Sequence, residues 1–278
     1  WAAALGTIPY LTLKALWLGG STVGVTDPDF LAAPGVVAAN AVTFALDLCV
    51  VVLALALTHA WGRRVPAWAL LLPAWVGTGF LVPMAVVILP TTLAMPADTT
   101  WSEPWLHPLV YGGFAWQGVF LVAAFALHAH ARWSSAVVAP TPGPTPLLHV
   151  IAAGGTAMAV LSAGLQLAVG DVVPLVVGGL TTAGAVGVLA LVRGATAHRW
   201  LAAAAAWVGS AVMFSWGLYG TLLAHTGALP VEGLDPVAGL AQLTGLLGGF
   251  SLAVAALLAL VGSATAVPDD TSAPRVHR

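Results

Sequence analysis

Eight runs of apolar residues constrain the fold of this chain more than any other feature of its sequence. The runs occupy residues 4–24, 36–60, 66–94, 108–131, 147–169, 172–192, 200–225 and 237–263. Each is long enough, at about 1.5 Å per helical residue, to cross a hydrocarbon core of about 30 Å. Backbone groups in lipid must be hydrogen-bonded within the protein, so these runs predict an all-α integral membrane protein, an eight-span helical bundle.

Composition excludes most soluble functions. The chain has 278 residues, of which 60% are hydrophobic and only 6% are charged, so the spans leave no room for a folded soluble domain. The single cysteine, Cys49, cannot form an internal disulfide. The sequence contains no H-E-x-x-H, Walker A or G-x-S-x-G motif and no basic run. We therefore expect no metal, no cofactor and no nucleic-acid partner.

Charge is distributed asymmetrically between alternate links. The links after the second, fourth and sixth runs, together with the tail, hold every cationic residue except Lys14: Arg63, Arg64, Arg132, Arg193, Arg199, Arg275 and Arg278. The other links hold only acidic charges: Asp27, Asp29, Asp98, Glu103, Asp171, Glu232 and Asp235. By the positive-inside rule, both termini are predicted to be cytoplasmic. The preference for Arg over Lys is typical of GC-rich bacteria, so we expect a bacterial inner-membrane location.

A proline-rich segment at 139–146 predicts a cytoplasmic linker between two halves, 1–138 and 147–264. Residues 265–278 are polar and predict a disordered cytoplasmic tail.

Two short sequence matches relate the two halves: AWVGT at 74–78 with AWVGS at 206–210, and GGF at 112–114 with GGF at 248–250. The matches suggest a parallel repeat of four spans, with an axis along the membrane normal. The second half lacks charged residues within its spans and is interpreted as packing scaffold.

A polar stripe runs along the first two spans. In the first run its members recur at spacings of four, three and four residues: Tyr10, Lys14, Trp17 and Ser21. In the second run they are Asn40, Thr43 and Asp47. The predicted runs place Lys14 and Asp47 at the same depth, about 15 Å inside the membrane, so we expect them to contact each other directly or through one water. The pair either carries function or only fixes the register of two helices.

Two further groups extend this stripe. Gln117 and Ser210 fall at the same depth as the charged pair. Lys14, Asp47 and Gln117 are therefore predicted to form the floor of an outward-opening cavity; the alternative is scattered interhelical hydrogen bonding.

Aromatic, acidic and histidine residues gather in and after the third link: Trp101, Glu103, Trp105, His107 and Tyr111. Tryptophans at this position either anchor the protein at the interface or form a ligand-gathering loop.

Other features are less specific. Five histidines lie at inner ends of spans or in an inner link: His59, His128, His130, His149 and His198. His128 and His130 point about 200° apart on a helix and cannot chelate one ion together, so we interpret the group as interfacial residues near lipid headgroups. Pro73, Pro83 and Pro90 predict a kinked or locally unwound third span.

The polar stripe favours transport or permeation of a small solute or protons, because it continues from the midplane to the outer face. An intramembrane enzyme is an alternative, with Asp47 as general acid or base acting on a lipid or isoprenoid. A third possibility is a structural subunit of a membrane complex. The expected partners are therefore the lipid bilayer and a small-molecule or lipid substrate, and the sequence does not indicate an oligomeric state.

Overall fold

The computed structural model describes residues 1–94, 101–138, 145–194, 197–226 and 236–264. Within these ranges the chain is helical, apart from turns and one isolated bridge between Val25 and Ser102. The long helices are α1 (Ala2–Leu18), α3 (Pro34–Thr58), α4 (Ala67–Pro83), α6 (Leu106–Val138), α7 (Pro146–Val169), α8 (Val172–Val192), α9 (Arg199–Thr226) and α10 (Pro236–Ala264). The short ones are α2 (Pro28–Ala32), η1 (Ala60–Arg64), η2 (Met84–Ile88) and α5 (Leu89–Ala94).

Several predicted features fall outside the described residues. They are most of the proline-rich linker (139–144), the tail (265–278) and the charged residues Asp98, Glu232, Asp235, Arg275 and Arg278.

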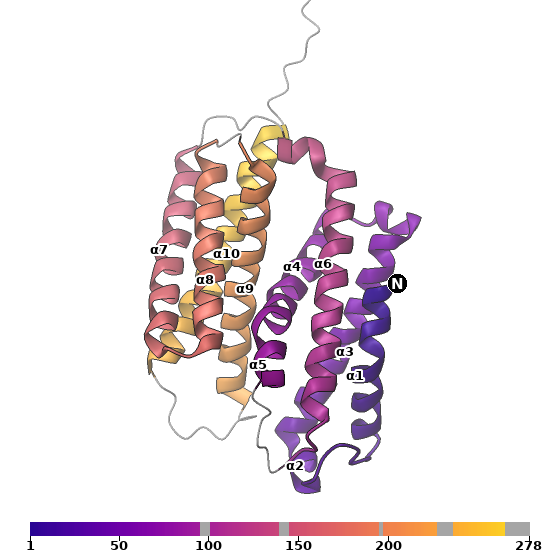
Figure 1. Ribbon diagram of the computed structural model, residues 1–278. Helices are drawn as coiled ribbons and strands as arrows, with labels where there is room; N and C mark the ends of the chain where they lie inside the picture. Colours follow the sequence, from indigo (N-terminus) through magenta and orange to yellow (C-terminus); the bar gives the residue numbers. More distant parts are fainter. Residues whose placement is uncertain (95–100, 139–144, 195–196, 227–235, 265–278) are drawn as a thin grey trace, which may run out of the picture.

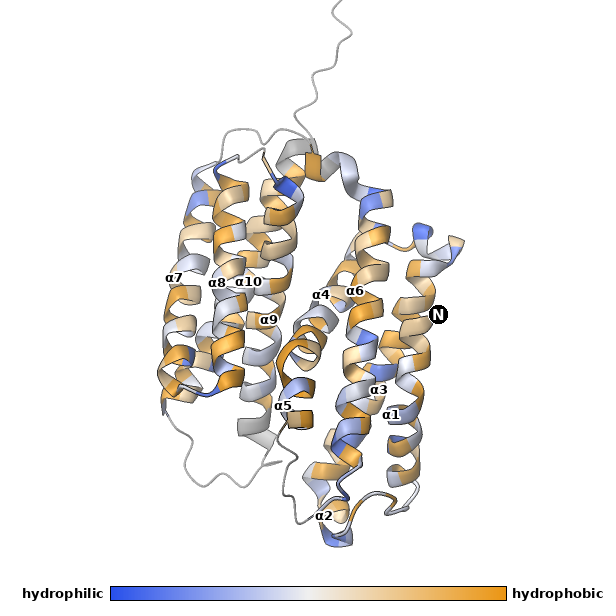
Figure 2. Cartoon of the chain, in the orientation of Figure 1, coloured by the Kyte–Doolittle hydropathy of each residue, from blue (hydrophilic) through white to orange (hydrophobic). Residues whose placement is uncertain are grey.

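The helices stand side by side and form two groups (Figure 1). One group contains α1, α3, α4 and α6, and the other contains α7 to α10. We call the two ends of the bundle the α2 end and the η1 end, after the short helices that lie there. Figure 2 shows apolar residues along the helices, with hydrophilic ones near the helix ends and also within α1, α3 and α6.

Seven helical segments in the described ranges are long and apolar enough to cross a membrane: α3, the segment from α4 through α5, and α6 to α10. The prediction of an all-α, multi-pass membrane protein is therefore confirmed at this level. The first helix is shorter, with 17 residues, or about 25 Å. The predicted number of eight spans consequently depends on α1.

The first predicted run ends earlier than expected. Helix α1 stops at Leu18, and the next residues, Gly19 and Gly20, turn the chain. Gly20 has φ +89°, which favours glycine, and the amides of Gly20 and Ser21 bond back to the carbonyls of Trp17 and Leu16. The prediction that Ser21 continues the helical stripe is therefore wrong, because the glycine pair ends the helix before it.

The third span is broken as its prolines predict. Pro83 ends the α-helical part, the π-helical turn η2 follows, and α5 completes the segment with Pro90 in its first turn. A proline lacks the amide hydrogen that an α-helix needs, so the widened turn accommodates this loss within a continuous segment. Pro73, by contrast, lies inside α4 without ending it.

The second group packs closely through small residues. A Cβ on Gly209 of α9 would lie 2.3 Å from the Cα of Gly184 in α8, so only glycine permits this approach. A buried core links all four helices, with Val188, Leu191 and Leu252 essentially inaccessible. The core cluster itself is apolar, and Arg199, at the start of α9, is a charged residue of this half that is buried.

Helices α4 and α9 form the main contact between the two groups. Gly79 is the closest point, since a Cβ there would lie 2.1 Å from the carbonyl oxygen of Ala211. Trp216 of α9 donates from Nε1 to the carbonyl of Gly79 at 3.2 Å, and Ser215 donates to the carbonyl of Val76 at 3.1 Å. The contact is thus both close and hydrogen-bonded.

Candidate membrane-embedded polar site

Helix α1 packs between α3 and α6 and brings their polar side chains together in the interior of the first group. The exposed fractions are 7% for Lys14, 6% for Asn40, 5% for Asp47 and 0% for Gln117. Tyr10 is also buried, and Thr43 is half-buried. We call these six residues the polar ladder: Lys14 and Asn40 form its first level, Tyr10 and Thr43 its second, and Asp47 and Gln117 its third.

The first level, nearest the α2 end, holds the only charged side chain of α1. Lys14 Nζ donates a hydrogen bond to Asn40 Oδ1. The ammonium also lies 4.7 Å from the centre of the Tyr10 ring and 5.0 Å from that of Trp17. One amide oxygen and two aromatic faces thus replace water around this charge.

The second level connects the other two. The Tyr10 side chain faces Thr43 of α3, and its ring packs edge-on against Phe114 of α6, with 4.6 Å between ring centres. Thr43 donates its own hydroxyl to the carbonyl of Ala39 at 2.7 Å. Hydroxyl groups therefore lie between the lysine and the carboxyl group.

The third level is the deepest. Asp47 faces Gln117, whose Nε2 donates to the carbonyl of Gly6 at 3.2 Å. Asp47 Oδ2 and Gln117 Oε1 are both buried and have no hydrogen-bond partner. Buried polar atoms normally have partners, so two unsatisfied oxygens on facing residues mark this level as a candidate site for a proton, a water or a polar solute.

Gly6 allows α6 to approach α1 at this level. A Cβ at Gly6 would lie 2.6 Å from Trp116 Cδ1 and 3.1 Å from Gln117 Cγ. Trp116 in turn donates from Nε1 to the carbonyl of Ala2 at 2.9 Å. The polar-stripe reasoning missed Gly6 and Phe114; the spacing of Gly6 four residues before Tyr10 was the available signal.

The predicted common depth of Lys14 and Asp47 is wrong. Lys14 lies four residues from the end of α1, or about 6 Å from the α2 end. Asp47 lies 13 residues into α3, or about 20 Å from the same end. The ammonium bonds to Asn40, two turns before Asp47, and makes no direct ion pair with the carboxyl group. The early end of α1 causes this difference.

The ladder is closed toward the α2 end. Leu13, Val25 and Leu106 form a buried apolar cluster there, and Trp17 donates from Nε1 to the carbonyl of Val23 at 2.9 Å. The predicted outward-opening cavity is therefore not open in this structure, because its floor residues Lys14, Asp47 and Gln117 are almost inaccessible.

The loop after α1 and the loop before α6 are joined above this cluster. The amide of Thr26 donates to the carbonyl of Trp101, and the amide of Glu103 donates to that of Gly24, each at 2.9 Å. The two loops thus form one cap over the ladder.

The aromatic residues of the second loop pack within this cap. Trp101 stacks on Phe30, with ring centres 4.6 Å apart, and lies 5.4 Å from His107. His107 stacks on Tyr111 at 5.9 Å. Trp105 is exposed on one side and packs over Gly24 on the other, while Glu103 is exposed. These aromatic residues therefore contribute to the structure of the cap.

Ser210 lies away from the ladder. Its hydroxyl accepts a hydrogen bond from Trp75 Nε1 at 3.0 Å, in the contact between α4 and α9. Equal depth in the membrane was thus insufficient to place Ser210 with Gln117.

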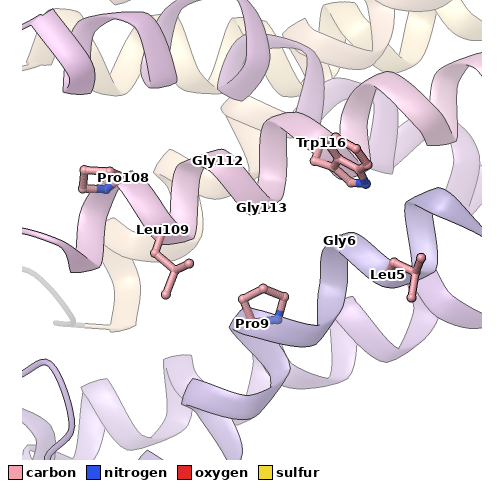
Figure 3. Close-up of a pocket in the computed structure, with 8 residues that line it drawn as sticks. All are labelled: Leu5, Gly6, Pro9, Pro108, Leu109, Gly112, Gly113 and Trp116. Atoms are coloured by element: carbon pink, nitrogen blue, oxygen red, sulfur yellow. The ribbon is translucent and has the colours of Figure 1, made fainter.

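A separate cavity of about 440 Å³ opens between α1 and α6 (Figure 3). Its lining is mostly apolar: Leu5, Gly6, Pro9, Pro108, Leu109, Gly112, Gly113 and Trp116. No ladder residue lines it, so it differs from the predicted polar cavity.

Within the described ranges, no three His, Cys, Asp or Glu side chains lie close enough to hold a metal ion. The histidines at the η1 end have aromatic neighbours instead: Trp1 for His59, Trp133 for His128 and Trp200 for His130.

The fold and the apolar helices define a multi-pass membrane protein with a buried polar site in one half. Comparison of the chain with protein-family models, with curated proteins and with solved structures gave no match. Assignment of function therefore starts from the polar ladder itself.

Proposed function

We propose that this protein moves protons or a small polar solute across the membrane and that the polar ladder forms part of the path. The observation that carries the proposal is the third level, where Asp47 Oδ2 and Gln117 Oε1 are buried and unsatisfied. Ionisable residues within membrane spans are costly, and they commonly mark ion pathways and proton relays.

The hydrogen-bonding pattern favours this function over simple helix pinning. An ion pair that only fixes helix register stabilises the protein most when the two charged groups contact each other and their remaining hydrogen bonds are also satisfied. Here Lys14 bonds to Asn40, and Asp47 retains an unpartnered oxygen. The carboxyl group can thus take up and release a proton at an oxygen that has no other hydrogen-bond partner.

The closed cap fits one state of an alternating cycle. In such a cycle a central site is exposed to one side of the membrane at a time. Opening toward the α2 end would require the loop after α1 to separate from the loop before α6. Two backbone hydrogen bonds join these loops, from Thr26 to Trp101 and from Glu103 to Gly24. We infer that an outward-facing state breaks this connection.

We also propose that α1 is an eighth span and that the two groups of helices are a parallel repeat. Two reciprocal hydrogen bonds support this: Trp75 Nε1 donates to Ser210 Oγ at 3.0 Å, and Trp207 Nε1 donates to Thr78 Oγ1 at 3.2 Å. The four residues are the equivalent tryptophans and hydroxyl residues of one sequence match, 74–78 with 206–210. A two-fold axis between α4 and α9 would produce such an exchange.

In this proposed topology both termini are cytoplasmic, and the α2 end faces outward. The residues of η1, with Arg63 and Arg64, then lie on the cytoplasmic side. The repeat places its axis along the membrane normal, so the two groups can rock against each other at the α4–α9 contact.

Liposome reconstitution tests the proposed transport. Purified protein is reconstituted with a pH-sensitive dye inside, and proton or solute movement is measured after an imposed gradient for a panel of small polar solutes. We expect Asp47→Asn to abolish the flux, because the amide cannot release a proton. The matched control is Asp171→Asn, which makes the same change at an exposed residue in the other group; its flux should equal that of the wild type.

Two outcomes would contradict the proposal. Equal flux in wild type and Asp47→Asn would exclude the carboxyl group from the path. Absence of any flux, together with chemical alteration of co-purified lipid that Asp47→Asn prevents, would replace transport by the enzyme alternative.

A further inference from the structure

The η1 end of the first group has a second cavity, of about 400 Å³, between the end of α3, η1 and α6. Its lining differs from that of the cavity in Figure 3, because it combines Arg63, His59 and His128 with apolar residues such as Leu57 and Leu127. None of the ladder residues lines it.

The lining contains an unsatisfied polar atom. His128 Nε2 is buried and has no hydrogen-bond partner. The other histidine uses its Nδ1 in two contacts, with the carbonyl of Leu55 at 2.9 Å and the hydroxyl of Thr58 at 3.1 Å. Its Nε2 is therefore the nitrogen that remains for a ligand, and it donates when the ring is protonated.

The turn that carries Arg63 is held in place from two sides. Arg132 of α6 donates to the carbonyl of Gly62 at 3.5 Å and to that of Val65 at 3.1 Å. Gly62 itself packs against α3 so closely that a Cβ would lie 1.6 Å from the carbonyl oxygen of Ala56. Arg63 thus extends from a fixed backbone, which lowers the entropy cost of binding at its guanidinium.

We propose that this cavity binds a phosphate group, carried by a membrane phospholipid or free in solution. A guanidinium offers paired donors that match phosphate oxygens, and the two imidazoles add further donors. Leu57 and Leu127 provide an apolar wall beside these donors, which suits the first carbons of an acyl chain.

The surrounding surface places the cavity at headgroup level. Trp61, within the turn that carries Arg63, and Trp68, at the start of α4, are exposed. Exposed tryptophans are enriched at the membrane–water interface, where phospholipid phosphates also lie. A lipid in the membrane would therefore reach the site without leaving its leaflet.

Native mass spectrometry of the full chain in detergent tests the proposal. The protein is titrated with phosphatidylglycerol and with diacylglycerol of the same chains. We expect selective binding of phosphatidylglycerol, and Arg63→Gln should weaken it about five-fold. His128→Leu should also weaken it, because leucine has no hydrogen-bond donor to offer within the cavity.

The chain offers a matched control for each variant. Arg64 follows Arg63 in the same turn, and His130 follows His128 by two residues, but neither lines the cavity. Arg64→Gln and His130→Leu should bind phosphatidylglycerol as the wild type does. Thermal unfolding in detergent checks that all four variants retain the fold.

A titration with inorganic phosphate separates the two sources of the ligand. Binding of phosphate alone that Arg63→Gln weakens would identify a soluble ligand; binding of phosphatidylglycerol alone would identify a lipid. The proposal is overturned if diacylglycerol binds as well as phosphatidylglycerol and inorganic phosphate does not bind. It is also overturned if Arg63→Gln and Arg64→Gln have the same effect, since the charge would then act without a defined site.

Discussion

Replacement of Asn40 by leucine should reveal how the lysine of α1 is stabilised inside the membrane. Asn40 Oδ1 is the hydrogen-bond acceptor of Lys14 Nζ, and both side chains are buried. Asn40→Leu keeps a similar volume but removes this acceptor. A hydrogen bond to a charged group contributes about 1.5–3 kcal/mol, and a buried charge left without its partner costs about 3–5 kcal/mol.

The aromatic neighbours reduce the expected loss. The rings of Tyr10 and Trp17 remain within 4.7 Å and 5.0 Å of the ammonium, and such contacts contribute about 0.5–2 kcal/mol. We therefore expect Asn40→Leu to lower the free energy of unfolding by about 2–3 kcal/mol. Lys14→Met should cost less, because it removes the charge and leaves only a neutral amide unsatisfied.

A double-mutant cycle measures the coupling directly. The free energy of unfolding is determined in mixed micelles for wild type, Lys14→Met, Asn40→Leu and the double variant. The double variant should recover about 1.5–3 kcal/mol relative to the sum of the single losses. The same cycle with Asp47→Leu in place of Asn40→Leu should give a smaller coupling, since Lys14 makes no direct ion pair with Asp47.

Lys14→Met combined with Ser162→Ala is the control. Ser162 donates to the carbonyl of Ala241 within the other group of helices, so its effect should add to that of Lys14→Met. Coupling between Lys14 and Asn40 below about 0.5 kcal/mol would refute the assignment of Asn40 as the partner of the ammonium.

Two further predictions concern the contact between the groups and the topology. Gly79→Ala should lower the free energy of unfolding by about 1–3 kcal/mol, because its Cβ would lie 2.1 Å from a carbonyl oxygen of α9. Gly77→Ala, on the same helix, would meet its nearest neighbour at 3.5 Å and should be neutral or stabilising in the same micelle assay; equal losses would contradict the close approach. In a Cys49→Ser background, Asp171→Cys should react with a membrane-impermeant thiol reagent added outside cells, whereas Ser135→Cys should react only after permeabilisation. The reverse pattern would invert the proposed topology.

The sequence alone determined the class of protein and the approximate spans. The length of an apolar run is a local property of the sequence, because each segment in lipid must satisfy its own backbone hydrogen bonds. The sixth run predicted a helix at residues 172–192, and α8 has these bounds. The break near Pro83 was also local, because a proline removes a donor wherever the helix lies. The same local reasoning missed the end of α1, since hydropathy does not register the left-handed turn at Gly20.

Only the tertiary structure decided which polar groups meet. Helix periodicity placed Lys14, Asn40 and Asp47 on suitable faces, but the partner of the ammonium depends on how far α1 is shifted along α3. In the structure Lys14 lies beside Asn40 of α3, and Gly6 allows the close approach of α1 to α6. Counting residues along each helix separately does not give the shift of α1 along α3, because the packing of side chains between the helices sets that shift.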